Sequence, residues 1–321
     1  MPRSSYKSWP GILLPETSRS FASFLTAAPR RALLSALLIL SAPIGMAAQA
    51  DNNAAHMVLV NVTVLDHTSR AVPGLEAEQF AVMNERSPHA VTYFSNADEP
   101  TSLVVVLDAT AGMAAQIDEE RKALAEFIHG ANPQDELALI VIHDEPQVAV
   151  HLGGSANEIE RMAGTIQADG FGSMWDGMYL SIAELQSSRC RRKAMIVISD
   201  DGEKYSRQAP STLMSVLKQA DVQVYAIGRF DQYANRFQVR TRALQLDEVT
   251  SVTGGRVLSG NDLSRAAAQI AYELRHQYIL GFYPSNPSRD GQWHELKVRL
   301  LGSVSTSKCR IYAQTGYTGR Q

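Results

Sequence analysis

The sequence is poor in the residues that build most catalytic metal sites. It contains only two cysteines, Cys190 and Cys309, in 321 residues. Two are too few for a disulfide framework, a four-cysteine zinc site or an iron–sulfur cluster. The eight histidines are scattered, without a His-x-x-x-His pair or a His/Cys cluster. Zinc chemistry and histidine-based catalysis are therefore not expected.

The sequence also lacks the signatures of nucleotide and nucleic-acid binding. Its glycines never form a Gly-x-x-x-x-Gly-Lys loop or a full Gly-x-Gly-x-x-Gly motif. Lysine and arginine number 30 against 33 acidic residues, for a net charge of −3, so the broad positive surface that attracts nucleic acid is missing. One short basic cluster is expected to be a solvated helix end: Arg189, Arg191, Arg192 and Lys193.

Residues 1–50 carry the pattern of an export signal. Arg30 and Arg31 precede an uncharged stretch that ends in Ala48-Gln49-Ala50, the small-residue pattern that signal peptidase recognises. Cleavage is expected before Asp51. The alternative is an uncleaved membrane anchor, because the stretch from Ala32 to Ala50 approaches the roughly 20 residues that cross a bilayer.

Export has consequences for charge and for the cysteines. Removal of residues 1–50 takes away five basic residues and one acidic residue, which leaves a net charge of −7. An oxidising compartment makes a disulfide between Cys190 and Cys309 chemically possible, although geometry decides whether it forms. We expect a periplasmic or secreted protein, held at the membrane only if the signal stays uncleaved.

Two segments of β character flank the middle of the chain. In residues 51–99, strands are expected near 58–65, 80–83 and 90–94, and in residues 277–321 near 278–283, 293–301 and 309–313. Neither segment is large enough to bury a core alone. We therefore expect the two to pair into one small β unit.

The middle of the chain, residues 100–276, alternates short apolar runs with segments of helical period. Strands are expected at 103–107, 137–142, 194–198 and 222–227, and helices near 117–129, 156–166, 175–186, 210–219 and 262–276. This rhythm predicts an α/β fold with a doubly wound, mostly parallel, Rossmann-like sheet. Ligands of such sheets bind beyond the carboxyl ends of the strands.

Asp108 and Asp200 each follow an expected strand of this sheet. Together with the hydroxyl of Thr110 they offer the hard oxygen ligands that Mg²⁺ or Ca²⁺ prefers. The alternative is that both aspartates cap the helices that follow. Three nearby aromatic residues, Trp175, Tyr179 and Phe171, are expected to be core or loop anchors rather than a ligand cage.

Several stretches in a fixed order carry a resemblance to a known family: residues 72–80, 103–113, 135–143, 170–180, 196–207, 225–228, 274–284 and 316–317. On these stretches the chain resembles the von Willebrand factor type A (VWA) domain, and more closely the VWA-related proteins abundant in Acidobacteria. The resemblance runs from about Met57 to Gly319. It implies a Rossmann-like fold and a metal-ion-dependent adhesion site that binds a divalent cation.

The family pattern of that site has Asp-x-Ser-x-Ser after the first strand and a threonine in a Gly-x-Thr loop. Asp108 matches the first aspartate, Thr110 replaces the first serine and Gly112 stands at the second. Gly172 occupies the threonine position, and the nearest hydroxyl, Ser173, comes one residue later. Two hydroxyl ligands of the pattern are therefore lost.

After a later strand, Asp200 matches the aspartate of the family's metal site, and Glu203 stands where a second acid is common. The resemblance implies metal ligands at Asp108, Thr110, Ser173 and Asp200, with Glu203 as an orienting neighbour. Two carboxylates with water can still hold Mg²⁺. We expect a degraded site with weakened affinity for a divalent cation.

The leading interpretation is an exported, non-enzymatic adhesion or scaffold module that binds a protein partner in the cell envelope or outside the cell. One alternative is a Mg²⁺-dependent phosphotransfer enzyme with Asp108 as nucleophile and Lys193 or Lys204 as the phosphate-neutralising cation. Against it, Thr110 stands where the phosphatase pattern has a second aspartate. The other alternative is a metal-independent envelope scaffold that uses the β unit as its contact surface.

Overall fold

The computed structural model describes the chain from residue 57 onward. The described ranges are 57–199, 205–229, 236–284, 290–302 and 309–319, with the backbone alone for 236–244. The chain divides into two units, Met1–Ala54 and Ala55–Gln321, and every described residue belongs to the second. The predicted export signal therefore lies outside the described residues.

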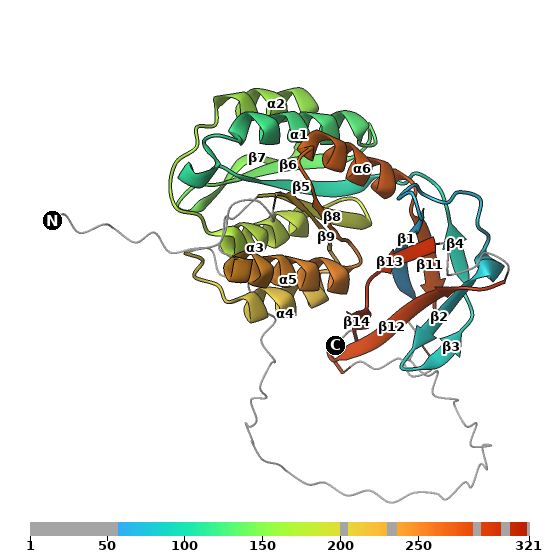
Figure 1. Cartoon of the computed structure of the whole chain (residues 1–321). Helices are drawn as coiled ribbons and strands as arrows, with labels where there is room; N and C mark the ends of the chain where they lie inside the picture. The colour runs from blue at the N-terminus through green and yellow to red at the C-terminus, as the bar shows by residue number, and fades with distance from the viewer. Residues whose placement is uncertain (1–56, 200–204, 230–235, 285–289, 303–308, 320–321) are drawn as a thin grey trace, which may run out of the picture. The chain divides into compact units, whose positions relative to one another are not determined.

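A six-stranded sheet lies at the centre of this unit (Figure 1). Its strands are β5 (Thr101–Asp108), β6 (Glu136–Ile142), β7 (Pro146–Gly154), β8 (Arg192–Ile198), β9 (Gln223–Gly228) and β10 (Val257–Ser259). They lie in the order β10-β9-β8-β5-β6-β7. All neighbours pair in parallel except β7, which runs antiparallel to β6. This confirms the predicted mostly parallel α/β sheet.

Helices cover both faces of the sheet, three on each. One face carries α1 (Ile117–Gly130), α2 (Ala156–Thr165) and α6 (Leu263–Arg275), and the other carries α3 (Met174–Glu184), α4 (Pro210–Ala220) and α5 (Arg236–Thr253). Successive residues of a strand point to opposite faces, so Val105 of β5 packs under the first set and Val104 under the second. All eight residues of β5 are buried.

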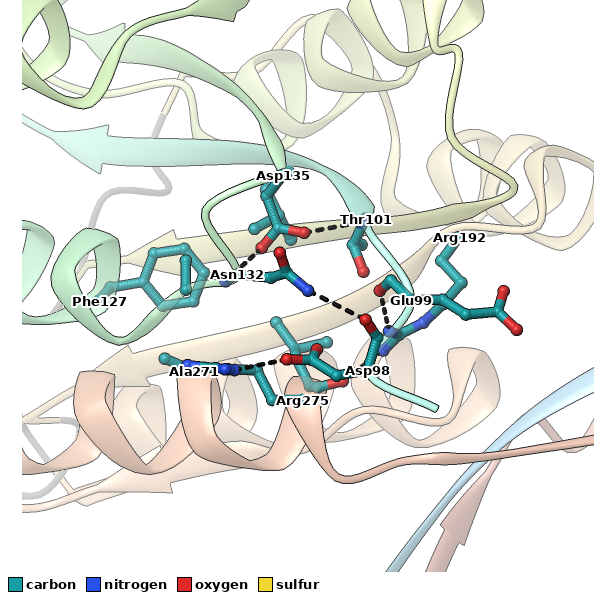
Figure 2. Close-up of a pocket in the computed structure, with 12 residues that line it drawn as sticks. Asp98, Glu99, Thr101, Phe127, Asn132, Asp135, Arg192, Ala271 and Arg275 are labelled. Atoms are coloured by element: carbon teal, nitrogen blue, oxygen red, sulfur yellow. Dashed lines mark hydrogen bonds and ion pairs between the residues drawn. The ribbon is translucent and has the colours of Figure 1, made fainter. Parts of the chain in front are cut away.

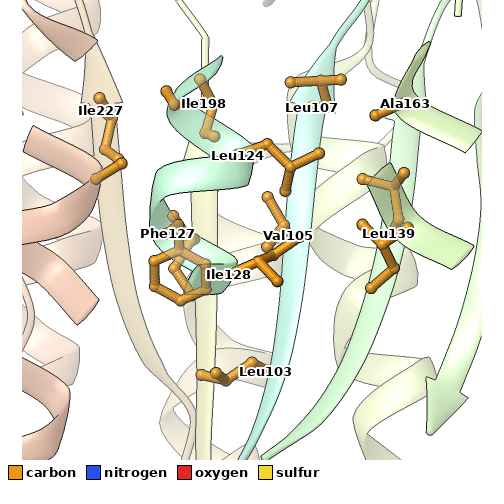
Figure 3. Packing of buried hydrophobic residues seen from close by; sticks show 14 of the residues in the cluster. Leu103, Val105, Leu107, Leu124, Phe127, Ile128, Leu139, Ala163, Ile198 and Ile227 are labelled. Atoms are coloured by element: carbon orange, nitrogen blue, oxygen red, sulfur yellow. The ribbon is translucent and has the colours of Figure 1, made fainter. Parts of the chain in front are cut away.

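The core on the first face shows why these segments fold as they do. Leu124 and Phe127 lie on one side of α1, and Figure 3 shows them over Val105 and Leu107 of β5. Each of the four is at most 1 % exposed. Burial of one such side chain contributes about 1.5 to 3 kcal/mol, so the packing of α1 is an important source of the fold's stability.

Polar residues at the helix ends set the boundaries of the elements. The Ser155 side chain accepts a hydrogen bond from the Glu158 N–H at the start of α2 (3.2 Å), and Asp262 accepts one from Arg265 at the start of α6 (2.9 Å). Pro210 begins α4, a position where its missing N–H costs nothing. These signals can be read in the sequence, and the predicted starts lie close to the observed ones.

The two chain ends form the expected small β unit, which consists of two four-stranded antiparallel sheets. One sheet has the order β13-β1-β11-β4 and the other β14-β12-β2-β3. The strands are β1 (Val58–Asp66), β2 (Phe80–Asn84), β3 (Ser87–His89), β4 (Tyr93–Ser95), β11 (Tyr278–Phe282), β12 (Trp293–Leu300), β13 (Cys309–Ala313) and β14 (Gly316–Thr318). Val62, Val82, Leu280 and Val298 share one apolar core between the sheets.

A buried polar network joins the β unit to the central sheet. The Gln277 side chain donates to Thr63 Oγ1 of β1 (3.0 Å) and to Gln223 Oε1 of β9 (2.8 Å), and it accepts from Arg192 Nη2 (2.6 Å). Arg192 also donates to the carbonyl of Glu99 (2.7 Å) and is only 4 % exposed. The prediction of a solvated basic cluster is therefore wrong for Arg192, because its guanidinium is needed inside this junction.

Other features were not expected from the sequence. The edge strand β7 and helix α5 have no counterpart among the predicted elements, and three 3-10 helices cover Ala77–Gln79, Ala111–Met113 and Leu185–Ser187. Cys190 and Cys309 are free thiols, so the disulfide that export permits does not form in this structure. Within the described residues, no helix combines the length and the apolar character that crossing a bilayer requires.

Candidate functional site

Asp108 closes β5 at the carboxyl edge of the sheet. Its side chain is fully buried, with 0 % exposure. Oδ1 accepts the Thr110 N–H (3.1 Å) and Oδ2 accepts the Ser199 hydroxyl (2.6 Å). The next α-helix, α1, begins only at Ile117, after a short 3-10 turn. The helix-capping alternative for Asp108 is therefore wrong, and its carboxylate instead organises the end of the strand.

Thr110 and Gly112 lie on the turn that follows β5. Thr110 is 6 % exposed and precedes the 3-10 helix Ala111–Met113. A Cβ placed on Gly112 would meet only Thr110 Oγ1, at 3.8 Å, which is an ordinary van der Waals distance. The position therefore has room for the Cβ of the serine in the family pattern.

The loop that carries Ser173 is tied to this turn by backbone hydrogen bonds. Asp169 N–H donates to the Ala109 carbonyl (2.8 Å), and Ala111 N–H donates to the Gly170 carbonyl (3.0 Å). The structure thus brings the Ser173 loop beside Asp108 and Thr110, as the resemblance implies. This contact joins segments about 60 residues apart in sequence.

Within that loop, the Ser173 hydroxyl is directed to the β6–β7 connection. It donates to the carbonyl of Asp144 (3.1 Å), and the side chain is 2 % exposed. A hydroxyl that donates its hydrogen keeps two lone pairs, so this bond leaves Ser173 chemically able to serve as a ligand. Gly172 has φ +92°, a conformation that disfavours the family's threonine.

Two of the predicted site residues, Asp200 and Glu203, lie outside the described residues. Ser199, just before the first of them, is described, and its hydroxyl donates to Asp108 Oδ2. The register of β5 and β8, with Leu107 opposite Ile198, brings Ser199 to the same edge of the sheet as Asp108. Among the described residues, no group of three or more His, Cys, Asp or Glu side chains is arranged to hold a metal ion.

The donors at this edge fit a hard divalent cation in part. Asp108 and Thr110 offer a carboxylate and a hydroxyl two residues apart, and oxygen donors of this kind suit Mg²⁺, which keeps several of its waters. The Ser199 hydroxyl and the Thr110 N–H orient the carboxylate, and partners of this kind commonly fix a metal ligand. A cation held here would bind through Asp108 and Thr110, with Ser173 on the adjacent loop.

Sequence reasoning did not identify two residues of this edge and assigned the wrong role to a third. Ser199 could have been found, because it ends a strand parallel to β5 and the ends of parallel strands meet at one edge. Asp144 could not, since its role depends on accepting the Phe171 N–H (2.9 Å) across the loop. Phe171 itself is 67 % exposed, so the prediction of a core or loop anchor is wrong for it, whereas Trp175 is buried at 2 %.

A pocket exists at the opposite edge of the sheet, where β5 and β8 begin (Figure 2). Its polar groups bond one another: Asp135 accepts the Thr101 N–H (2.7 Å), and Arg275 Nε donates to Asp98 (2.8 Å). Burial raises the pKa of Asp135 from its usual 3.8 to about 6. Apart from the buried Arg192 Nε, which has no hydrogen-bond partner among the described residues, these polar groups bond one another, so the pocket belongs to the packing of this edge.

Lys193, one of the cations considered for phosphotransfer, also lies at that opposite edge. It pairs with Ser102 in the β5–β8 register, six residues before Asp108. At about 3.3 Å per strand residue, this is roughly 20 Å from the carboxylate. Lys193 therefore cannot neutralise a phosphate bound at Asp108.

Part of the chain matches a known protein family. Residues 103–203 match the model of the von Willebrand factor type A domain. No curated protein was found to match the chain.

Solved structures of similar proteins include an aerotolerance-related membrane protein from Bacteroides fragilis, with 13 % identity, 54 % of this chain and 98 % of that chain covered, and a TM-score of 0.46. A von Willebrand factor type A protein from Catenulispora acidiphila has 12 % identity and a TM-score of 0.47, and the match covers 81 % of this chain and 73 % of that one. The PilB minor pilin from Streptococcus sanguinis has 11 % identity and a TM-score of 0.43, and the match covers 57 % of this chain and 63 % of that one. The stretch that matches the family model contains β5, β6 and β8 together with Asp108, Thr110 and Ser173, and on this basis the chain carries a von Willebrand factor type A domain.

Proposed function

We propose that the protein is an exported, non-enzymatic interaction module that binds a protein partner through the carboxyl edge of its central sheet. The observation that carries the proposal is the buried Asp108 carboxylate, held by the Thr110 N–H and the Ser199 hydroxyl beside the Ser173 loop. A buried carboxylate is usually paired with a charge, hydrogen-bonded or bound to a metal ion. Its place at the strand ends, where such sheets bind ligands, favours a binding role.

A divalent cation, Mg²⁺ in the first instance, would bridge the module and its partner. Asp108, Thr110, Ser173 and Asp200 would supply the oxygen ligands, with Glu203 orienting one of them. Glycine at positions 112 and 172 removes two hydroxyl ligands, so the affinity is expected to be weak. The bound cation would supply positive charge to attract an oxygen ligand of the partner.

A non-enzymatic role is supported by the residue at position 110 and by the place of Lys193. Thr110 stands where the phosphatase pattern has a second aspartate, so Asp108 as a nucleophile would lack its acid partner. Lys193 lies at the far edge of the sheet, too far from Asp108 to neutralise a phosphate there. The other lysine considered for phosphotransfer, Lys204, lies outside the described residues.

Calorimetric titration of the purified protein with Mg²⁺, Mn²⁺ and Ca²⁺ tests the cation, with thermal denaturation in parallel. We expect binding heat and a rise in melting temperature for the wild type, and loss of both for Asp108→Ala. Asp108→Asn keeps the size of the side chain and removes its charge, so it separates lost binding from lost packing. Asp98→Ala, at the opposite edge, is the matched control.

The partner is tested by capture from the cell-envelope fraction with and without a chelator. Capture that needs both the cation and Asp108 supports the proposal. Capture that survives chelation and the Asp108→Asn variant would show a metal-independent scaffold instead. The export step has its own test, because the mass of the protein recovered from outside the cytoplasm should correspond to a chain that begins at Asp51.

A further inference from the structure

Two aromatic side chains stand in solvent at the candidate binding edge. Phe171 is 67 % exposed and Tyr205 is 63 % exposed, more than any other large apolar side chain among the described residues. Their rings meet edge to face, with centroids 5.6 Å apart and an interplanar angle of 67°. Aromatic residues are enriched at the centres of interfaces, so this exposed pair is a candidate contact for a partner.

The loops hold both residues in place. The Phe171 N–H donates to Asp144 Oδ1 (2.9 Å), and the Tyr205 N–H donates to the Gly172 carbonyl (3.1 Å). Gly172 N–H in turn donates to the His143 carbonyl (2.9 Å). These bonds fix the backbone under each ring, and a surface arranged in advance loses less entropy when a partner binds.

The charge around the pair is negative. Asp144, Glu145 and Asp169 are exposed acids on the connections that carry or contact Phe171. In the described parts of these connections, 143–146, 168–173 and 205–209, the one Lys or Arg is Arg207, which forms an ion pair with Glu145. Exposed rings beside uncompensated carboxylates attract a cation, because ring faces and carboxylates both carry negative potential.

We infer that Phe171 and Tyr205, with Asp144 and Asp169, form a docking site for a lysine or arginine side chain on the protein partner. The inference rests on the proposed function, in that it assumes the same sheet edge as the contact face. The rings would contact the cationic head and its apolar stem, while the carboxylates draw it in. A basic segment is thus the occupant that the charge of this surface selects.

Short labelled peptides of equal length test the site by fluorescence polarisation. One peptide is rich in lysine and arginine, a second has glutamine at those positions and a third has glutamate. We expect the basic peptide to bind most tightly and its affinity to fall as salt is raised. At the strength of an exposed cation–π contact, each ring should account for about a threefold change in affinity and both for about tenfold.

The variants are Phe171→Ala, Tyr205→Ala and the double substitution. Both side chains are exposed, so the variants should fold, and circular dichroism and melting temperature verify this. Tyr283→Ala is the matched control, because that ring is 47 % exposed and lies after β11 in the β unit. We expect the control to bind the basic peptide as the wild type does.

Retained affinity in the double variant, or equal binding of the basic and glutamine peptides, overturns the inference. The inference is also overturned if the wild type self-associates in sedimentation and shows no peptide preference, while the double variant is monomeric. The occupant of the site would then be a second copy of the chain. The wild-type protein separates the two proposals when cation titration and peptide titration are compared. A wild type that binds no divalent cation but prefers the basic peptide refutes only the metal bridge. A wild type that binds the cation through Asp108 but shows no preference for the basic peptide refutes only the aromatic site.

Discussion

Gly112 and Gly172 replace two hydroxyl residues of the family pattern, but the structure predicts that only one of them can be restored. A Cβ on Gly112 meets Thr110 Oγ1 at 3.8 Å and no closer atom, so Gly112→Ser should change the free energy of unfolding by no more than about 0.5 kcal/mol. Gly172 has φ +92°, where a β-branched side chain is strained. Gly172→Thr should therefore cost about 1 to 3 kcal/mol.

The two variants should also differ in cation binding. Serine at position 112 adds a hydroxyl oxygen beside Thr110, and one more ligand on the same turn should raise the affinity for Mg²⁺ about tenfold, or about 1.4 kcal/mol. Gly172→Thr should bring no comparable gain, since the strain opposes the geometry that places Ser173. The double variant Asp108→Asn with Gly112→Ser controls for adventitious binding and should lose the gain.

The assay is calorimetric titration with Mg²⁺, together with urea unfolding of each variant. A Gly112→Ser protein that binds Mg²⁺ no more tightly than the wild type would show that the turn after β5 does not face the cation. A Gly172→Thr protein as stable as the wild type would show that the loop relaxes. Either outcome would refute the reasoning from the backbone of these loops.

Two further predictions concern the opposite edge and the junction with the β unit. Gln277→Leu should lower the free energy of unfolding by about 2 to 4 kcal/mol, measured by urea denaturation. The substitution removes the donor to Gln223 Oε1 and one acceptor of the buried Arg192 Nη2. A loss below about 1 kcal/mol would contradict this. Asp135, whose pKa is raised by burial from 3.8 to about 6, binds its proton more readily in the folded state. Its contribution to stability is therefore fully present below about pH 4 and is lost as pH rises through about 6. Asp135→Asn should remove that part of the pH dependence, and parallel wild-type and variant curves between pH 4 and 7 would contradict the assignment.

The central sheet could be predicted because its strands are continuous apolar runs, and burial on both faces is the reason for such runs. A parallel strand covered on both faces must be apolar along its whole length, and β5, β6, β8 and β9 all show such a run. The edge strand β7 could not be found in this way. It alternates buried and exposed positions and includes Gln147, His151 and two glycines, so its composition does not separate it from a loop.

The junction between the two halves of the unit was predicted only in outline. Pairing of the chain ends follows from the fact that neither β segment can bury a core alone. The role of Arg192 does not follow, because its sequence neighbours Arg191 and Lys193 suggest a solvated cluster. Only the folded chain shows that this one guanidinium meets the Glu99 carbonyl and the Gln277 side chain inside the protein.

At the candidate site, sequence reasoning found the residues that belong to strand ends and missed those that depend on loop geometry. Asp108 and Thr110 follow a recognisable strand, and the described structure brings them beside the Ser173 loop. Phe171 and Tyr205 lie in different loops, 34 residues apart, and no local pattern states that both rings face solvent at one place. The backbone under each ring is held by a tertiary hydrogen bond, to Asp144 for Phe171 and to Gly172 for Tyr205, and such bonds cannot be read from the sequence.

The two parts of the candidate edge would select different groups of a partner. A cation held by Asp108 would attract an oxygen ligand, and with glycine at positions 112 and 172 it would have fewer hydroxyl ligands than the family pattern implies. The exposed rings of Phe171 and Tyr205, beside Asp144 and Asp169, would instead attract a cationic group of the partner. The relative effect of Asp108→Asn and of the Phe171/Tyr205 double substitution on capture of the same partner measures which contact contributes more to recognition.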